Sequence, residues 1–383
     1  MTKSGLPPSL ALPLKGGGKK KTPSPLKGEA RPVRSLFAIE PGGANCEEQL
    51  AGSWGGGELS FGAKIVRRLL CSATLCALIF AAPPGKAADK LRVGKSVGTA
   101  WTFMPLDIGQ HEGIFAKYGV DLEVANFGGD AKLQQALASD SMDLGLGSGP
   151  SMAFVAKGAP VIGVAAFAGA PRNIGVVVAA DSPIQQVADL KGKLMAISTA
   201  GSLTEWLTKR LSAHEGWGPD GMKMVSIGDT AQQASALKAR QVDAFMGGTE
   251  AGYRLEEAGE GRVLVAMDSY VSHFVTHVVF ARKQFVAERP ASIEKFLKAF
   301  FATIAWMKAH KDESNAITAP LLRESAAVAN KTYDLQMPML ELDGQFDPEG
   351  LELIKQSYVD LGLLDKKPSD DQMLTRQFLP VRP

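Results

Sequence analysis

The sequence predicts an α/β fold with two lobes, each built on a largely parallel sheet. From Leu91 onward, short apolar runs alternate with amphipathic stretches, which is the pattern of βαβ units. The alternation occurs as two similar series, and segments beginning at Gly128 and Gly228 repeat one another. The chain of 383 residues could hold two or three domains, and its 45% hydrophobic and 21% charged residues are ordinary for a soluble globular protein.

The expected elements follow the chain in order. In the first series we expect strands at 91–97, 120–127 and 143–147, and helices at 103–117 and 131–138. In the second series we expect strands at 194–198, 222–227, 242–247 and 262–268, and helices at 202–214 and 231–239. The β-branched runs 173–180 and 273–282 bound the second series and are the expected crossing strands. A helix with an apolar stripe follows at 291–310, and another begins at Pro348 after the N-cap Asp347.

The internal repeat has an offset of 100 residues. The identical positions are Gly128/Gly228, Ala131/Ala231, Ala136/Ala236, Leu137/Leu237, Asp143/Asp243 and Gly147/Gly247. Each copy is expected to be a helix, a polar turn and a strand, with Asp130 and Thr230 as N-caps. The loop after Gly147 therefore has a counterpart after Gly247. Ligands of open α/β sheets bind beyond the carboxyl ends of such strands.

The first 88 residues differ from the rest. They hold 12 basic and 5 acidic residues, whereas the remainder holds 30 basic and 35 acidic residues, which disfavours nucleic-acid binding. Residues 64–88 combine a twin arginine, an apolar run and small residues, the pattern of a signal peptide and of periplasmic export. Residues 1–63 are expected to be a disordered or non-native extension, with translation starting near Val66. The three cysteines all precede Ala88, so the mature chain has no thiol.

Four segments carry a resemblance to a known family: "PLDIGQHEGIFAKYGVDLEV", "ALASDSMDLGLGSG", "DSPIQQVADLKGKLMAISTAGS" and "ALKARQVDAFMGG". The chain from Leu91 to Leu364 resembles the periplasmic substrate-binding proteins of ABC importers for nitrate, alkanesulfonates and taurine, and the relatives that bind thiamine-pyrimidine precursors. The resemblance implies the type II periplasmic-binding fold, in which two α/β lobes joined by a two-strand hinge close over a solute.

The same resemblance implies the organisation and the partners. We expect lobe 1 at 89–178 and 275–383, and lobe 2 at 179–274. The expected partners are a small-molecule ligand, a permease contacted directly and its ATPase, with the chain a monomer that needs no cofactor. The family covers several solute classes, so the ligand has to be argued from the site.

Four loops are expected to converge on the cleft between the lobes. Their candidate ligand-binding residues are Thr99, Trp101 and Thr102; Ser148, Gly149 and Ser151; Ser198, Thr199 and Ser202; and Thr249 and Glu250. Three of the loops run into helix starts rich in Ser, Thr and Gly, whose N–H and hydroxyl donors suit an anionic group. Ordinary helix capping would select the same residues, and that alternative stays open.

Charged residues leave further alternatives. Glu250 could pair with a ligand amine, or stabilise the first turn of a helix. Arg172, near the expected hinge, could anchor a carboxylate or lie on the surface. His273 and His277 are four residues apart in a strand-like setting, where they are about 13 Å apart, so no metal site is expected.

The sequence leaves two alternatives to solute binding. An enzyme on the same scaffold, such as a dehydratase acting on a cyclic acid, would need an acid or base, for which Glu250 or His273 could serve. No set of nucleophile, base and orienting residue is visible in the sequence, so no catalytic residue is expected. The effector domain of a transcriptional regulator would need a DNA-binding module where the export signal lies.

Overall fold

The computed structural model describes residues 88–200, 202–218 and 220–383. The extension expected at 1–63 and, apart from Ala88, the signal peptide expected at 64–88 lie outside these residues. None of the helices formed by the described residues has the length and apolar character needed to cross a membrane.

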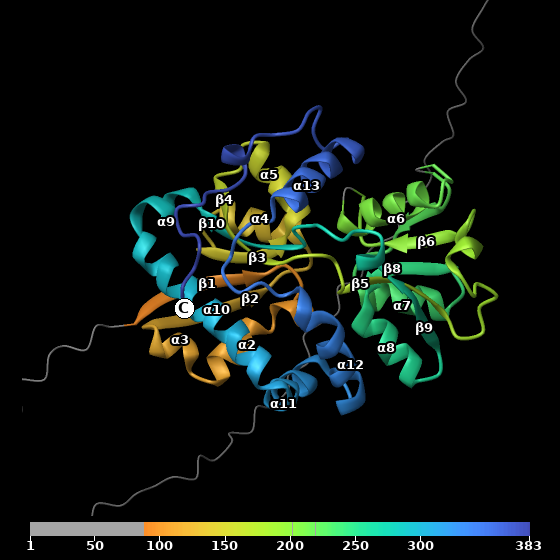
Figure 1. Ribbon diagram of the computed structural model, residues 1–383, viewed down its shortest axis with the longest axis horizontal. Helices are drawn as coiled ribbons and strands as arrows, with labels where there is room; N and C mark the ends of the chain where they lie inside the picture. The colour runs from red at the N-terminus through yellow and green to blue at the C-terminus, as the bar shows by residue number, and fades with distance from the viewer. Residues whose placement is uncertain (1–87, 201, 219) are drawn as a thin grey trace, which may run out of the picture. The chain divides into compact units, whose positions relative to one another are not determined.

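The first sheet has five strands in the order β2-β1-β3-β10-β4 (Figure 1). Strand β1 runs parallel to β2 and β3, whereas β10 is antiparallel to β3 and β4. The strands are β1 Asp89–Lys95, β2 Val120–Asn126, β3 Leu144–Ser148, β4 Val161–Ala168 and β10 His277–Arg282.

The second sheet follows the same plan, with the order β7-β6-β8-β5-β9. Strand β6 runs parallel to β7 and β8, and β5 is antiparallel to β8 and β9. The strands are β5 Ile174–Ala179, β6 Leu194–Ile197, β7 Lys223–Ser226, β8 Ala244–Gly248 and β9 Gly261–Ala266. Each sheet thus contains one strand that runs antiparallel to both of its neighbours, β10 in the first sheet and β5 in the second.

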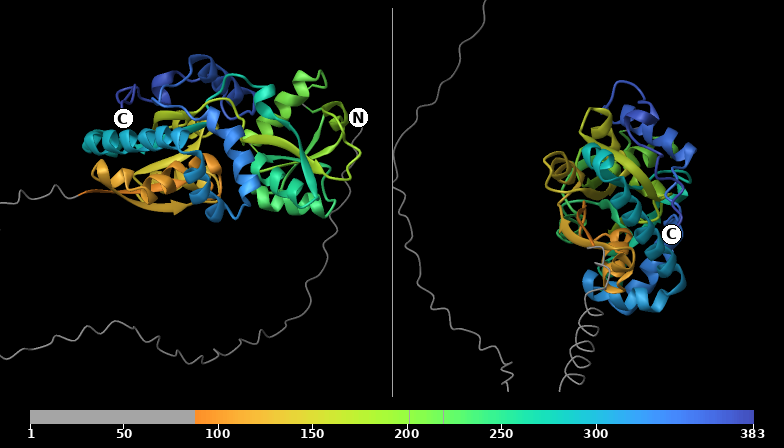
Figure 2. Two further views of the ribbon diagram at one scale, coloured as in Figure 1. Left: turned by 60° about the horizontal axis from the view of Figure 1, so that its bottom comes forward. Right: turned by 90° about the vertical axis from the view of Figure 1, so that its left-hand side faces the viewer.

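Helices cover both faces of each sheet (Figure 2). Helices α2, α3 and α10 pack together on one side of the first sheet, and α4 and α5 lie on the other. In the second sheet, Met246 of β8 packs in the same cluster as α6, whereas the adjacent Phe245 packs with α7 and α8. The helices are α2 Pro105–His111, α3 Ile114–Lys117, α4 Asp130–Ala138, α5 Met152–Ala156, α6 Leu203–His214, α7 Thr230–Lys238, α8 Thr249–Glu257, α9 Lys283–Glu288, α10 Pro290–Ala309, α11 Lys311–Leu322, α12 Ala326–Gln336 and α13 Pro348–Asp360.

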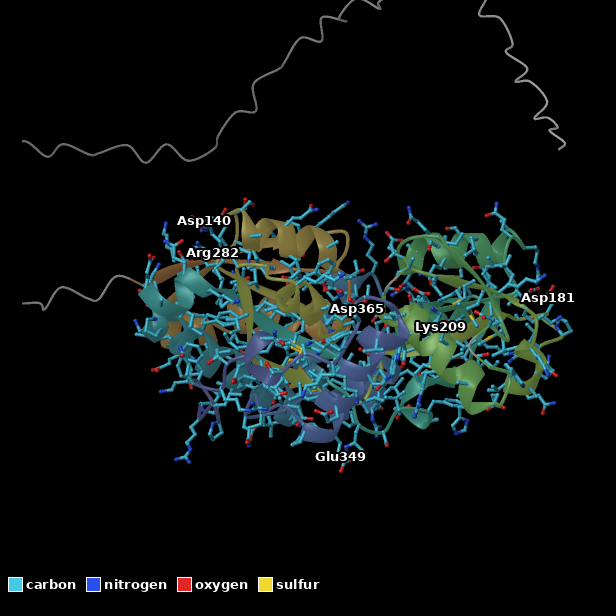
Figure 3. The ribbon with its side chains drawn as sticks, turned by 90° about the horizontal axis from the view of Figure 1, so that it is seen from above. Asp140, Asp181, Lys209, Arg282, Glu349 and Asp365 are labelled. Carbon is cyan, nitrogen blue, oxygen red and sulfur yellow. The ribbon has the colours of Figure 1, made fainter. Side chains whose placement is uncertain are left out.

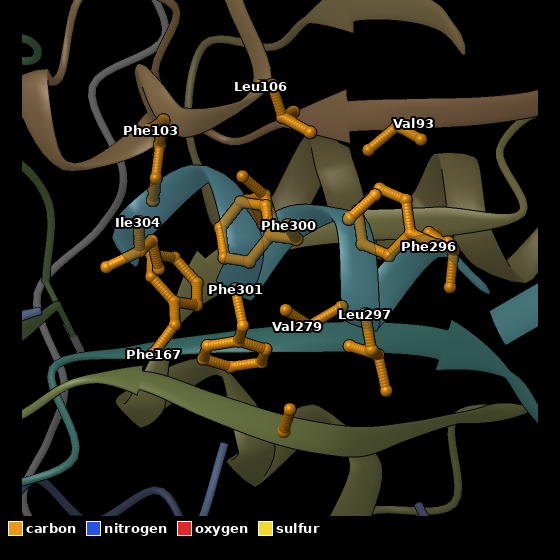
Figure 4. Packing of buried hydrophobic residues seen from close by; sticks show 14 of the residues in the cluster. Val93, Phe103, Leu106, Phe167, Val279, Phe296, Leu297, Phe300, Phe301 and Ile304 are labelled. Atoms are coloured by element: carbon orange, nitrogen blue, oxygen red, sulfur yellow. The ribbon is translucent and has the colours of Figure 1, made fainter. Parts of the chain in front are cut away.

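The core of the first lobe is built around α10. Figure 4 shows Phe296, Phe300 and Phe301 of this helix packed towards Val279 and Phe167. These side chains are fully buried. The rings of Phe167 and Phe300 pack edge to face, with their centroids 5.2 Å apart. The apolar stripe expected at 291–310 is therefore a core face.

The internal repeat is present in the structure with its offset of 100 residues. Helices α4 and α7 begin at 130 and 230, and strands β3 and β8 begin at 144 and 244. The turn between helix and strand places Asp140 and Arg240 in the left-handed region, with φ of 62° and 57°. The two copies thus share their backbone conformation as well as their sequence pattern.

The repeated aspartates Asp143 and Asp243 have equivalent structural roles. Asp143 accepts a hydrogen bond of 2.9 Å from the backbone N–H of Arg92 in β1, and Asp243 accepts one of 2.8 Å from that of Leu194 in β6. Each carboxylate therefore ties its own strand to the parallel neighbour. This contact accounts for an Asp just before each strand.

The glycines of the "DLGLG" segment allow α4 to lie close to β3. A Cβ on Gly145 would come within 2.9 Å of Leu133 of α4, and one on Gly147 within 2.8 Å of the Asp130 carboxylate. The leucines that alternate with these glycines, Leu144 and Leu146, face the α10 side of the sheet. The alternation in this segment therefore reflects strand packing.

Several predicted elements need correction. The helix expected at 103–117 is divided into a 3-10 turn at Trp101–Phe103 and helices α2 and α3, because Pro105 starts α2 and Gly113 adopts φ 65°. The N-caps are Gly129 and Asp229, one residue before the expected Asp130 and Thr230. Strand β4 and helices α11 and α12 were not predicted. The N-cap Asp347 is confirmed, since it accepts from the N–H of Glu349 at 3.2 Å.

The division of the chain into lobes stays a prediction, but strand pairing refines it. Strand β5 pairs with β8 and β9, so it belongs to the second sheet, whereas the expected boundary at 178 assigned most of it to lobe 1. Strand β10 pairs within the first sheet. The chain passes between the sheets just before each of these strands, at 169–173 and 270–276.

Candidate functional site

The four expected loops follow the carboxyl ends of neighbouring parallel strands. β1 and β3 are adjacent in the first sheet, and β6 and β8 are adjacent in the second. Within each sheet, the two loops therefore emerge at the same edge, where open α/β sheets bind ligands. Three groups of candidate residues lie at the starts of the helical segments after β3, β6 and β8, and the loop after β1 holds Thr99, Trp101 and Thr102.

The first group is centred on Ser148. Its N–H and its hydroxyl both donate to the carboxylate of Asp130, at 2.9 and 2.7 Å. Burial raises the pKa of Asp130, although these bonds and one from Ser96 oppose the rise. The donors that were expected to hold an anionic solute thus already hold an internal carboxylate.

The other two residues of this loop also have partners within the protein. The Ser151 hydroxyl donates to the Ser148 carbonyl at 2.6 Å. Gly149 donates to Thr276 at 2.9 Å, and a Cβ at Gly149 would overlap the carbonyl oxygen of Val275. Close packing accounts for the glycine, and the binding role of these residues stays a prediction.

The second group is a cluster of three hydroxyls at the start of α6. The Thr204 hydroxyl oxygen lies 2.9 Å from those of both Ser198 and Ser202, and it also accepts from the N–H of Ser198 at 2.9 Å. Ser202 is the N-cap and accepts from the N–H of Glu205 at 3.3 Å. Thr204 was not among the expected site residues, although it stands two positions after the predicted cap.

The third group lies at the start of α8 and contacts α12. Gln336 donates its amide N–H groups to the Thr249 hydroxyl at 3.2 Å and to the Glu250 carboxylate at 3.1 Å. All three side chains are buried, and burial raises the pKa of Glu250. Beside them, Arg254 of α8 pairs at 2.8 Å with Glu324, which precedes α12.

A buried histidine joins the two passages between the sheets. His277, the first residue of β10, lies with its Nε2 3.0 Å from the Thr102 hydroxyl and 3.1 Å from the amide nitrogen of Asn173. Burial lowers the pKa of His277 to about 3, so its ring is neutral near pH 7. The Asn173 carbonyl in turn accepts from the N–H of Thr249 at 3.0 Å, which links this histidine to the start of α8.

Trp101 lies within the same region. Its ring packs edge to face against the ring of Tyr333 of α12, with the centroids 5.7 Å apart, and Trp101 is 1% exposed. The structure thus brings Trp101, Thr102, Thr249 and Glu250 into one buried region with α12.

The remaining candidates are more exposed, and Thr199 joins the second group only through its carbonyl, which accepts from the N–H of Ser202 at 3.3 Å. Thr99 and Thr199 are exposed. Arg172 is partly exposed and lies 3.5 Å from the carboxylate of Asp268. His273 is half exposed and pairs with Asp347 at 2.9 Å.

One buried cation was missed by the sequence analysis. Lys95, the last residue of β1, is 3% exposed and pairs with Asp107 of α2 at 2.8 Å. A lysine at the end of an apolar strand, with an aspartate one helix further on, could have suggested it. Within the described ranges, no group of three His, Cys, Asp or Glu side chains is arranged to hold a metal ion.

A polar cavity of about 480 Å³ lies at the other end of the first sheet. Its lining includes Arg92, Asp140 and Arg282, and Figure 3 shows Asp140 beside Arg282. Arg282 pairs with Asp140 at 2.9 Å, and Arg92 pairs with it at 2.8 Å. The guanidinium groups of this cavity are therefore already paired with carboxylates.

Comparison of the sequence with known protein families gives a match. Residues 101–314, which include Trp101, Thr102 and the starts of α6 and α8, match the family described as NMT1/THI5 like. The chain belongs to the NMT1/THI5-like family.

Two relatives of this NMT1/THI5-like chain carry informative names. A Bacillus subtilis protein named for binding aliphatic sulfonates is 25% identical over 230 residues, 60% of this chain and 68% of the relative. A Haemophilus influenzae protein named for thiamine biosynthesis is 25% identical over 239 residues, 61% of this chain and 71% of the relative. The first name states what that protein binds, and the second states a biosynthetic pathway.

Solved structures share the fold. The periplasmic aliphatic sulphonate binding protein SsuA of Escherichia coli matches with a TM-score of 0.64 and 23% identity, over 75% of this chain and 92% of that one. SsuA of Xanthomonas axonopodis pv. citri, bound to MOPS, matches with a TM-score of 0.66 and 18% identity, over 76% and 100%. The predicted type II periplasmic-binding fold is confirmed. The desulfurization enzyme DszB also matches, with a TM-score of 0.56 and 17% identity over 76% and 97%, so the fold alone carries both binding proteins and enzymes.

Proposed function

We propose that this protein is the extracytoplasmic solute-binding component of an ABC importer. It would capture a small anionic or zwitterionic solute between its two lobes and deliver it to a membrane permease. The names of the relatives, the family and the fold support this proposal. The proposed site of action is the periplasm, the proposed state is a monomer, and the proposed role is binding without catalysis.

The observation that carries the proposal is the hydroxyl cluster of Ser198, Ser202 and Thr204 at the start of α6. Unlike the donors of Ser148, which bond a carboxylate, these hydroxyls bond one another and backbone N–H groups. They lie where the first backbone N–H groups of a helix of 12 residues attract negative charge. Hydroxyl groups can turn their hydrogens towards an incoming anion without burying a cation.

Closure of the lobes is the proposed mechanism of capture. A solute that contacts the α6 hydroxyls in one lobe and the region of Trp101 and α12 in the other stabilises the arrangement in which both contacts form. The solute shifts the equilibrium between the open and the closed arrangement by as much as its affinities for the two differ. The neighbouring passages at 169–173 and 270–276 are the proposed hinge.

Calorimetric titration of the full chain tests this function. Short alkanesulfonates, nitrate, aromatic carboxylates and pyrimidines are the probes, and the double variant Ser198→Ala/Ser202→Ala is compared with the unsubstituted chain. We expect at least one probe to bind, and the variant to bind it at least tenfold more weakly, about 1.4 kcal/mol.

The double variant Ser139→Ala/Ser141→Ala is a matched control, because it removes two hydroxyls 3.1 Å apart on an exposed turn. It is expected to bind as the unsubstituted chain does. Equal weakening in both variants, or binding by none of the probes, would refute the proposed function.

A further inference from the structure

Several buried polar atoms near the start of α8 have no hydrogen-bond partner among the described residues. They include the indole nitrogen of Trp101, the amide oxygen of Asn173 and the amide oxygen of Gln336. Their side chains belong to residues that are 1%, 6% and 0% exposed. A buried polar atom that stays unpaired costs about 1–3 kcal/mol, so such atoms are normally satisfied by water or by a ligand.

The orientations of the two amides follow from their neighbours. The Gln336 amide nitrogen faces the Glu250 carboxylate at 3.1 Å, and a carboxylate only accepts, so the amide oxygen of Gln336 is left free. The Asn173 amide nitrogen lies 3.1 Å from Nε2 of the neutral His277. Nε2 accepts this bond, which leaves the amide oxygen of Asn173 free.

The residues that carry the free oxygens are neighbours, because both contact Thr249. The Asn173 carbonyl accepts from the N–H of Thr249 at 3.0 Å, and Gln336 donates to the Thr249 hydroxyl at 3.2 Å. The Glu250 carboxylate is on the next residue of α8. Trp101 contacts Tyr333, which precedes Gln336 by one helical turn.

This region holds more acceptors than donors. It combines the carboxyl group of Glu250 and two free amide oxygens with two free donors, the Trp101 indole nitrogen and Nδ1 of His277, which carries the ring proton when Nε2 accepts. The nearest cation in the same helix, Arg254, donates to Glu324 at 2.8 Å. The described residues therefore give Glu250 no ion pair at hydrogen-bond distance. Burial raises the pKa of Glu250 and the charge of Arg254 opposes the rise, so a ligand cation would stabilise the ionised form further.

We propose that the solute presents a nitrogen with several N–H donors, an ammonium or amidinium group, to the Glu250 carboxylate and the amide oxygens of Asn173 and Gln336. This inference rests on the proposed function and narrows its solute to a zwitterion. The anionic end would then meet the hydroxyls at the start of α6. An acceptor-rich site of this kind rejects an analogue that lacks the N–H donors, because its oxygens would stay unpaired.

Matched pairs of probes test the proposal in the full chain. One pair is 3-aminopropanesulfonate and propanesulfonate, and the other is 4-aminobutyrate and butyrate. We expect the amino member of at least one pair to bind at least tenfold more tightly. In Glu250→Gln, which keeps an acceptor for Gln336, that preference is expected to fall at least tenfold.

Glu256→Gln is the matched control, since Glu256 is an exposed residue of the same helix and pairs with Lys331. It is expected to keep the preference. Equal affinity for the members of each pair, or a preference unchanged in Glu250→Gln, would overturn the inference and leave the proposed function standing. Binding of no probe by any form of the chain would overturn both.

Discussion

The Ser148 hydroxyl donates a hydrogen bond of 2.7 Å to the carboxylate of Asp130, and the Ser148 N–H donates a second to the same carboxylate at 2.9 Å. The carboxylate thus lies where the loop after β3 would otherwise hold an anion. A Cβ on Gly147 would lie 2.8 Å from the Asp130 carboxylate, so β3 has room for this carboxylate only because residue 147 is glycine. The donors of Ser148 are therefore bonded within the protein.

Ser148→Ala is therefore expected to lower stability more than solute affinity. Loss of a hydrogen bond to a buried carboxylate costs about 1.5–3 kcal/mol. Urea unfolding should show that loss in the free energy of unfolding, while calorimetric titration shows an affinity within about threefold of the unsubstituted chain. A tenfold loss of affinity with unchanged stability would instead assign Ser148 to the solute.

Gly149→Ala is expected to destabilise the protein severely. The new Cβ would overlap the backbone carbonyl of Val275 and a side-chain carbon of Ile354, and such overpacking costs about 1–3 kcal/mol or more. Gly128→Ala is the control, because its Cβ would meet only the mobile end of Lys132, at 3.3 Å. Thermal unfolding compares the two, and similar melting temperatures would contradict the packing described for the start of the helical turn after β3.

The aspartates of the repeat should differ in how much they stabilise the fold. Asp143 is 6% exposed and accepts from the Arg92 side chain at 2.7 Å and from Arg282 at 3.1 Å, in addition to its bond to the β1 backbone. Asp243 is exposed and bonds the backbone of β6. We expect Asp143→Asn to cost about 2–4 kcal/mol and Asp243→Asn about 1 kcal/mol. Equal costs in urea unfolding would show that the arginines contribute nothing.

Stability should depend on pH through Glu324. Burial raises the pKa of Glu324 to about 7, and the nearby Glu250 carboxylate adds to the rise. Between the ordinary value of 4.5 and about 7, the folded protein holds a proton that the unfolded chain has lost. The contribution of Glu324 to the free energy of unfolding is therefore fully present below pH 4.5 and is lost as the pH rises to about 7.

Urea unfolding at several pH values checks this dependence in Glu324→Gln, which keeps an oxygen acceptor for Arg254. The variant should lose less stability over this range than the unsubstituted chain. The exposed Glu294→Gln serves as control and should follow the unsubstituted chain. Parallel curves for all three proteins would exclude Glu324 as the source.

The sequence predicts the repeat because its signal is local. Helix, turn and strand recur at 130–148 and 230–248, and the repeated aspartates bond the neighbouring strand in both copies. Strand β4, "VIGVAAFA", was missed because a run of small and apolar residues buried on both faces shows no alternation.

The buried region around α8 could not be predicted in the same way. His277 and Asn173 are 104 residues apart in the chain, and Gln336 is 86 residues from Glu250. No local pattern brings such residues together, since α12 was not predicted and its position depends on packing against α8. The candidate list therefore contained Thr249 and Glu250 without the residues that bond them.

Hydrogen exchange with and without a bound solute tests the central claim most directly, because a solute held between the lobes must contact both. With a saturating solute from the probe set, we expect slower exchange in peptides that span 198–206 of the second lobe and, together with them, in peptides that span 101–104 and 332–336. Protection confined to one lobe, or unchanged exchange in both, would contradict capture between the two sheets.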